Sequence, residues 1–222
     1  NDSQYVTNYI TSGSKKMNNT SNLYLTGNCT VENNTFNNAI SMKNYSSPSK
    51  LTIKGRASIY SAVMLNYDTI FKNNLLITSN CTSLKLNAPC YAKGDVQYSG
   101  GTIEGTNKLM LYGDLNVEAS NANISNLDFC SSLPQTVSGT LTVATVSNNN
   151  KSFSGVTVND KVYVTKLYNV PSSPRHNTNN SFTLTGNATV SSSFNDSINI
   201  ENWTCSQNIN IDGLVKASGT IN

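Results

Sequence analysis

Two distant stretches of the chain have almost the same sequence, and this repetition limits the fold more than any other feature. Residues 23–31 read LYLTGNCTV and residues 182–190 read FTLTGNATV. Each is followed by a second related segment, at residues 36–44 and 194–202. Self-similarity of this kind is typical of stacked repeats, in which each unit buries its apolar side against its neighbours.

The shared pattern alternates apolar and polar residues, with glycine commonly at the fifth position. Such alternation predicts half-buried strands, and no window shows a helical period. A second short strand is expected within most repeats, and a degenerate repeat is expected near residues 141–143. Copies of the pattern begin at residues 23, 51, 75, 109, 162, 182 and 209.

These strands predict an all-β fold: a single-stranded right-handed parallel β-helix, or β-solenoid, of about 8–10 coils of 20–30 residues. We expect it to span residues 23–222 as one domain, with residues 1–22 as an N-terminal cap or leader. The open end at residue 222 suggests a fragment whose coils continue in a longer protein. An antiparallel β-sandwich would also give many short strands, but it has no reason to repeat one sequence.

Glycine and asparagine in the repeats predict how the coils turn and stack. Glycine reaches backbone angles that other residues avoid, so corners are expected at the fifth position of the pattern, namely Gly27, Gly55, Gly113, Gly186 and Gly213. Asn28, Asn80 and Asn187 share the sixth position. Stacked amides can hydrogen-bond along the axis, so this position predicts an asparagine ladder.

The composition argues against several classes of function. The chain has 222 residues with a net charge of +3 and no long basic run, which does not fit a nucleic-acid-binding surface. Its apolar stretches are too short for a membrane span. A single histidine and the absence of a Cys-x-x-Cys motif argue against a zinc site, so we expect no metal and no cofactor.

The five cysteines have two interpretations. Cys29 and Cys81 occupy a pattern position that holds small apolar residues elsewhere, which favours buried free thiols. Cys81 and Cys90 are close enough in sequence to form one local disulfide, and we keep this as an alternative.

No catalytic motif stands out. His176 lies in a loop rich in proline, asparagine and serine, without an evident carboxylate or nucleophile to complete a catalytic group. The carboxylates form no tight pair in sequence, although two of them could still meet across neighbouring coils, as polysaccharide hydrolysis requires. We therefore predict no catalytic residues and keep a polysaccharide lyase or hydrolase as an alternative.

Binding residues are predicted from exposure and from irregular insertions. The segment 171–181 interrupts the repeats, and insertions on one side of a solenoid often bind ligands. Threonines recur at the fourth pattern position and would form rows of hydroxyl groups, and tyrosines would add amphipathic contact area. The predicted binding residues are Arg175, His176, Asn177, Tyr112, Tyr163, Thr26, Thr78, Thr165 and Thr185.

The repeated Leu-x-Leu-x-Gly-Asn-x-x-Val pattern with asparagine-rich turns resembles the β-helical passenger regions of bacterial autotransporters and two-partner secreted adhesins. The Asn-Pro-Asn motifs of two-partner secretion domains are absent, and five cysteines are unusual for such passengers. The resemblance implies a secreted or cell-surface virulence adhesin or structural stalk. Its partners would be a host or matrix component, a glycan, or another copy of itself. The alternatives are a polysaccharide-binding or polysaccharide-degrading protein, such as a phage tailspike, and a β-helical toxin fragment.

Overall fold

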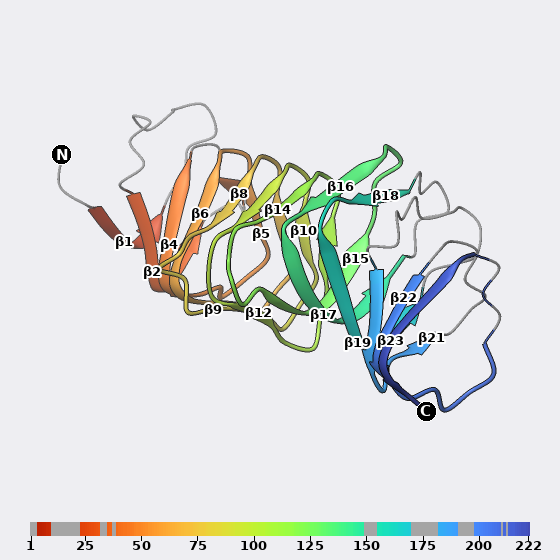
Figure 1. Cartoon of the computed structure of the whole chain (residues 1–222). Helices are drawn as coiled ribbons and strands as arrows, with labels where there is room; N and C mark the ends of the chain where they lie inside the picture. The colour runs from red at the N-terminus through yellow and green to blue at the C-terminus, as the bar shows by residue number, and fades with distance from the viewer. Residues whose placement is uncertain are drawn as a thin grey trace.

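The computed structural model describes residues 4–9, 23–31, 35–36, 39–148, 155–169, 182–190, 198–209, 211 and 213–222. Within these residues the chain forms only strands and connecting turns, without a helix. The strands pair in parallel and stack into a β-solenoid of about nine turns, drawn from the N-terminus to the C-terminus in Figure 1. The predicted all-β parallel solenoid is therefore confirmed.

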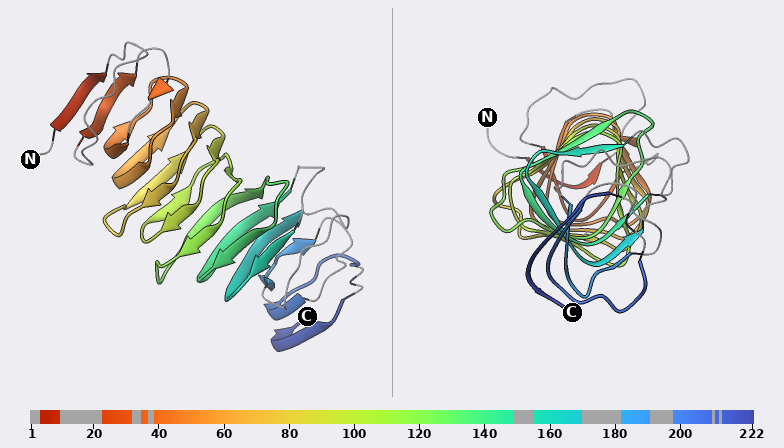
Figure 2. Two further views of the ribbon diagram at one scale, coloured as in Figure 1. Left: turned by 90° about the horizontal axis from the view of Figure 1, so that it is seen from above. Right: turned by 45° about the vertical axis from the view of Figure 1, so that its right-hand side comes forward.

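Each turn crosses three faces, which we number in the order in which the chain visits them; the view on the right of Figure 2 looks more nearly along the stack. Face 1 contains β3 (Thr35–Phe36), β5 (Leu51–Ile53), β7 (Thr69–Phe71), β10 (Cys90–Ala92), β13 (Leu109–Leu111) and β21 (Thr189–Val190). Face 2 contains β8 (Leu75–Ile77), β11 (Val96–Tyr98), β14 (Leu115–Val117), β16 (Gln135–Ser138) and β18 (Val156–Val158). Face 3 contains β9 (Ser83–Leu86), β12 (Thr102–Glu104) and β20 (Phe182–Gly186).

The longer strands bend around a corner and contribute to two faces. Near the N-terminus they turn from face 2 to face 3, at the corner that we call corner 2–3. These strands are β1 (Gln4–Tyr9), β2 (Leu23–Val31), β4 (Ile40–Ser46) and β6 (Ala57–Leu65). Further along the chain the continuous strands turn from face 3 to face 1, at corner 3–1. These strands are β15 (Asn123–Phe129), β17 (Thr140–Ser147), β19 (Lys161–Asn169), β22 (Ile198–Trp203) and β23 (Val215–Ile221).

The pairing register gives the length of a coil and corrects the predicted range. Thr183 pairs with Asn199 in a short coil, whereas Leu115 pairs with Val137 in a longer one. The coils therefore lie at the short end of the predicted range or below it. The prediction was too long because it measured the distance between copies of the pattern. Those copies lie on different faces of the solenoid. The number of residues between two copies therefore does not correspond to a whole number of coils.

The first strand extends the stack into the segment predicted as a cap or leader. β1 pairs in parallel with β2, and Gln4, Tyr5 and Val6 align with Leu23, Tyr24 and Leu25. The rest of residues 1–22 lies outside the described residues.

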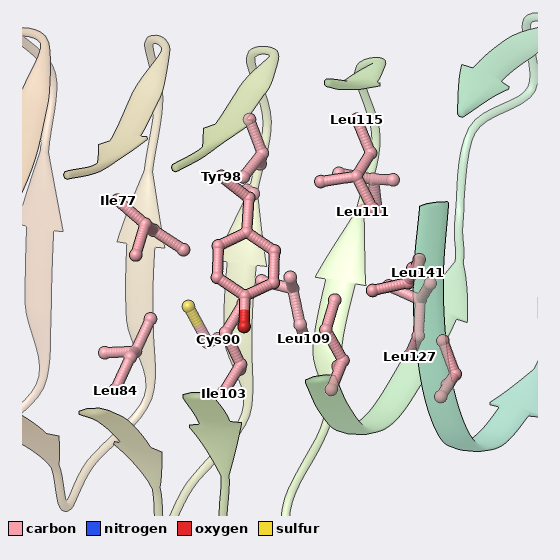
Figure 3. Close-up of a cluster of buried hydrophobic side chains, with 14 of the residues drawn as sticks. Ile77, Leu84, Cys90, Tyr98, Ile103, Leu109, Leu111, Leu115, Leu127 and Leu141 are labelled. Atoms are coloured by element: carbon pink, nitrogen blue, oxygen red, sulfur yellow. The ribbon is translucent and has the colours of Figure 1, made fainter. Parts of the chain in front are cut away.

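The core is a column of inward-facing side chains that stack on the same residue position of the next coil. On face 2, Ile59 aligns with Ile77, and Ile77 aligns with Tyr98. All three are fully buried. Figure 3 shows the ring of Tyr98 reaching across the interior toward Cys90 and Ile103. Burial of each such side chain contributes about 1.5–3 kcal/mol, so the stacked apolar columns are the main stabilising feature.

Glycine at the fifth pattern position makes a left-handed corner at two of the predicted places. Gly27 and Gly186 have φ values of 60° and 62°, a conformation that suits glycine. Gly55 and Gly113 do not have a positive φ, and Gly213 adjoins residue 212, which lies outside the described residues. At Gly113 the reason for glycine is close packing, because a Cβ atom would lie 2.6 Å from the backbone of Gly94 in the preceding coil.

The structure contains an asparagine ladder, but it is not formed by the predicted residues Asn28, Asn80 and Asn187. Asn66, Asn87 and Asn107 stack at corner 3–1, where Asn87 Nδ2 donates to Asn66 Oδ1 at 2.9 Å and Asn107 Nδ2 donates to the Asn87 carbonyl at 2.7 Å. The predicted members do not share one corner. Asn28 and Asn80 lie at corner 2–3, whereas Asn187 follows β20 at corner 3–1.

Candidate binding faces

The structure distributes the predicted binding residues over three faces instead of one surface. Tyr112 lies at the edge of face 1, Thr26 and Thr78 lie on face 2, and Tyr163, Thr165 and Thr185 lie on face 3. Arg175, His176 and Asn177, with the whole segment 171–181, lie outside the described residues.

Two of the predicted threonines hold neighbouring coils together. Thr78 is buried, and its Oγ1 donates a hydrogen bond of 2.9 Å to the carbonyl of Ile59 in the preceding coil. Thr165 Oγ1 donates to the Val143 carbonyl at 3.4 Å in the same way. These hydroxyl groups are engaged in the fold, so the four threonines do not form the predicted row of exposed groups.

The alternative disulfide between Cys81 and Cys90 is wrong, because both residues are free thiols. Cys81 lies in the turn between β8 and β9 at corner 2–3, whereas Cys90 begins β10 on face 1. The chain crosses face 3 between them, which carries the two side chains to different sides of the core. Burial raises the pKa of Cys81 to about 11 and that of Cys90 to about 12, so both thiols are protonated at neutral pH. The interpretation of Cys29 and Cys81 as buried apolar residues is confirmed.

Face 2 carries a groove of about 310 Å³ that crosses several coils. Its lining combines amide, carboxylate and guanidinium groups with the partly exposed side chain of Leu76. The residues that line it are Arg56, Asn74, Leu75, Leu76, Asp95, Val96, Gln97, Asp114 and Asn116. Amide and carboxylate groups around a small apolar surface can bind the hydroxyl groups and the ring faces of a sugar.

A ladder of side-chain oxygens forms one edge of this groove. Asn74 Oδ1 accepts the backbone N–H of Asp95 at 3.1 Å, and Asp95 Oδ1 accepts the N–H of Asp114 at 3.0 Å. Asp114 Oδ1 then accepts the N–H of Thr136 at 2.7 Å. Each oxygen satisfies a backbone group of the next coil, which fixes the positions of the two carboxylates on neighbouring rungs.

Glu118 continues the polar surface beside the groove. Its carboxylate accepts hydrogen bonds from Ser99 Oγ at 2.8 Å and Gln97 Nε2 at 3.0 Å. Both hydrogen bonds lower the pKa of Glu118 below its ordinary value, and the bond from Ser99 has the larger effect. Glu118 is therefore a poor proton donor at neutral pH and does not suit the role of a general acid.

Face 3 carries a wider and shallower groove of about 570 Å³ near corner 2–3. Met64, Lys85 and Glu104 lie along it on three successive coils, since Met64 aligns with Lys85 and Lys85 with Glu104.

Face 1 differs from the other faces in the charges that it presents. Lys54, Lys72 and Lys93 follow its strands on successive coils, and Lys108 forms an ion pair of 3.3 Å with the buried carboxylate of Asp128. Lys108 Nζ also donates to Ser147 Oγ at 2.9 Å. The carboxylates of the groove, Asp95 and Asp114, lie at the corner between face 1 and face 2, two residues after Lys93 and Tyr112.

The described ranges contain no cluster of three or more histidine, cysteine or acidic side chains placed to hold a metal ion. No helix among these residues is long and apolar enough to cross a membrane.

In comparisons with known proteins, the chain matches no family model, no curated protein and no solved structure.

The groove on face 2 and the lysines of face 1 were not predicted from the sequence. A signal for both exists in four triplets that follow the strands of face 1, namely Lys54-Gly-Arg, Lys72-Asn-Asn, Lys93-Gly-Asp and Tyr112-Gly-Asp. Each triplet begins one coil after the one before it, because β5, β7, β10 and β13 pair in that order. The spacing of these triplets is therefore the coil length, which the spacing of the longer pattern obscured.

Proposed function

We propose that this chain is a noncatalytic attachment module, secreted or displayed at a cell surface, that binds a glycan in the groove on face 2. The observation that carries the proposal is the lining of that groove by fixed polar groups from successive coils. Asp95 and Asp114 are held by the backbone of the next coil, and Gln97 is held by Glu118. A preorganised row of acceptors and donors loses little entropy when it binds the hydroxyl groups of a sugar.

The shape of the surface also supports attachment. The parallel coils carry outward side chains in rows along the axis, so one contact can repeat from rung to rung. Several weak contacts along one extended ligand raise the overall affinity without a deep pocket.

The test is binding to an array of polysaccharides, followed by titration calorimetry with each polysaccharide that binds. Replacing Gln97 and Asn116 with alanine removes two amides that line the groove and should weaken binding about tenfold, since each lost hydrogen bond costs about 0.5–1.5 kcal/mol. The exposed pair Asn80→Ala and Asn121→Ala, on turns outside the groove, is the matched control. If both pairs bind like the parent chain, the site is not on face 2.

A polysaccharide hydrolase is the second candidate, and one observation favours it. Asp95 and Asp114 lie on neighbouring rungs of the same groove, and rungs are about 4.8 Å apart. This spacing is close to the separation of about 5–5.5 Å between the two carboxyl groups of retaining glycosidases. Release of reducing ends from any polysaccharide, abolished by Asp95→Asn or Asp114→Asn, would replace the attachment proposal with an enzymatic function.

A further inference from the structure

Three lysines of face 1 form a row parallel to the solenoid axis. Lys54, Lys72 and Lys93 each follow a strand of face 1 directly, after β5, β7 and β10. The backbone N–H of Lys72 donates to the Ile53 carbonyl and that of Lys93 to the Phe71 carbonyl, both at 2.8 Å. The row is therefore in register, with one lysine per rung and about 4.8 Å between rungs.

Among the described residues, none of the three lysines forms an ion pair, and the nearest carboxylate in sequence is Asp95, two residues after Lys93. The ion pairs of Lys108 with Asp128 and of Lys161 with Glu201 do not involve the row. Lys54 and Lys72 are exposed. Like charges on adjacent rungs repel each other, and a bound anion would remove that repulsion.

The third lysine lies between two tyrosine rings. Lys93 Nζ is 3.0 Å from the ring centroid of Tyr112 on the next coil and 5.7 Å from that of Tyr91 on its own coil. Burial lowers the pKa of Lys93, and the ring faces partly replace the water that its ammonium group has lost. The row thus ends at Lys93, which lies against aromatic rings and is partly shielded from water. An anionic partner would bind there more strongly than at the exposed lysines.

A second row, parallel to the lysines, is largely apolar. Ile70 aligns with Tyr91, and Tyr91 aligns with Met110, on the outward side of β7, β10 and β13. All three side chains are partly exposed. This row places partly exposed apolar side chains, one of them aromatic, beside the row of positive charges.

The other edge of face 1 contains charges of both signs. Lys50 and Lys108 are there, with Asp68 on the coil between β5 and β10. The carboxylate of Asp128, further along the face, is neutralised by Lys108. Among the described residues, Asp68 is the one carboxylate at this edge of face 1 between β5 and β13, and it forms no ion pair.

From these rows we propose that face 1, between β5 and β13, is a second binding site, which takes a linear acidic polysaccharide lying along the solenoid axis. Carboxylate or sulfate groups of the polysaccharide would contact Lys54, Lys72 and Lys93, while its sugar rings lie on Ile70, Tyr91 and Met110. The rise of one rung, about 4.8 Å, is close to the length of one sugar unit in an extended chain. A polysaccharide fits better than a nucleic acid because three lysines in one row, without arginine, make a short and narrow basic surface.

This site adjoins the groove on face 2, because Lys54 and Lys93 lie two residues before Arg56 and Asp95, but its contact residues differ from those of the groove, so separate variants test the two proposals. The test uses the full chain and titration calorimetry with four probes: polygalacturonate, heparin, neutral dextran and double-stranded DNA. Polygalacturonate supplies carboxylates and heparin supplies mainly sulfates, which separates the two sources of negative charge. We expect binding to at least one of these two acidic polysaccharides, weakening as salt is added because ions screen the lysines.

Three variants assign that binding to face 1. The double variant Lys54→Gln and Lys72→Gln should weaken it about five- to tenfold, in line with two exposed charge contacts. Lys166→Gln with Lys216→Gln makes the same change of net charge away from face 1 and should have little effect. Tyr91→Ala should weaken binding while keeping its salt dependence, because it removes apolar contact and no charge. Circular dichroism checks that each variant is folded.

Three results would overturn the proposal. The first is no binding to either acidic polysaccharide. The second is an equal loss in both lysine pairs, which would indicate attraction by net charge alone. The third is tighter binding of DNA than of polysaccharide at the same salt concentration, which would assign the surface to nucleic acid.

Discussion

The two ends of the solenoid build the same corner at different places around the axis. Near the N-terminus, Gly27, Asn44 and Ser61 have a positive φ and lie at corner 2–3 in successive coils. Near the C-terminus, Gly186, Asn202 and Gly219 have a positive φ at corner 3–1. The two matching sequences of residues 23–31 and 182–190 each contain the first member of their set.

The two corners also share an aromatic residue whose side chain hydrogen-bonds across the corner. Tyr45 follows Asn44, and its hydroxyl donates to the Cys29 carbonyl at 3.0 Å. Trp203 follows Asn202, and its Nε1 donates to the Ala188 carbonyl at 2.8 Å. Cys29 and Ala188 occupy the same position in the two matching sequences. The repeated sequence therefore specifies a corner and the aromatic side chain that hydrogen-bonds across it. It does not specify whether that corner is corner 2–3 or corner 3–1.

Removing the aromatic closures should have the largest effect and should act locally. Trp203→Ala and Tyr45→Ala each leave a large cavity, and we expect each to lower the free energy of unfolding by about 3–5 kcal/mol. Because solenoid coils contact mainly their neighbours, hydrogen exchange should increase near the substituted corner and little at the other end. Faster exchange along the whole chain in either variant would show that the two corners are not independent.

The next test concerns the residues that have a positive φ at the two corners. Gly27→Ala and Gly186→Ala should each destabilise by about 1–2 kcal/mol, since nothing lies within 4 Å of the added Cβ and only the backbone angle is strained. Ser61→Gly, at a φ of 55°, should instead stabilise slightly by releasing the same strain. Denaturant midpoints measure all three. A clear difference between Gly27→Ala and Gly186→Ala would mean that the two corners are not equivalent.

The asparagine ladder lies between these two regions and should have a smaller effect. Asn87→Ala removes the hydrogen bond that Asn87 Nδ2 donates to Asn66 Oδ1, while the backbone carbonyl that accepts from Asn107 remains, and we expect a loss of about 1 kcal/mol in the free energy of unfolding. Asn80→Ala, at an exposed corner position, is the control and should change stability little. Equal losses in the two variants would indicate a general effect of asparagine in turns and no contribution from the ladder.

The smallest expected effect depends on pH. The pKa of Glu118 is below its ordinary value of 4.5 in the folded chain, so its contribution to stability is present above that value and is lost as pH falls through the folded pKa. Glu118→Gln should therefore flatten the loss of stability on acidification. Unfolding curves measured from neutral pH down through the acid range test this difference, and an unchanged acid branch would contradict it.

The sequence was sufficient to predict stacked parallel strands, because alternation and repetition are local properties. It was not sufficient to predict the coil length, since the repeated corner moves from corner 2–3 to corner 3–1 and distorts the spacing. The groove of Asp95 and Asp114 was missed because its residues lie one coil apart in the chain and meet only through the register. The role of Thr78 was also missed, because nothing in the pattern distinguishes an exposed hydroxyl from one bound to the preceding coil.

The in-register stacking of short coils has a mechanical consequence. A force that pulls the two ends apart along the axis would act on all the stacked coils in series, and coils would detach one at a time because each is held mainly by the coil beside it. Extension should then proceed in a series of similar steps. Each detached coil, once fully extended, would lengthen the molecule by about 60 Å, since an extended chain spans about 3.3–3.6 Å per residue.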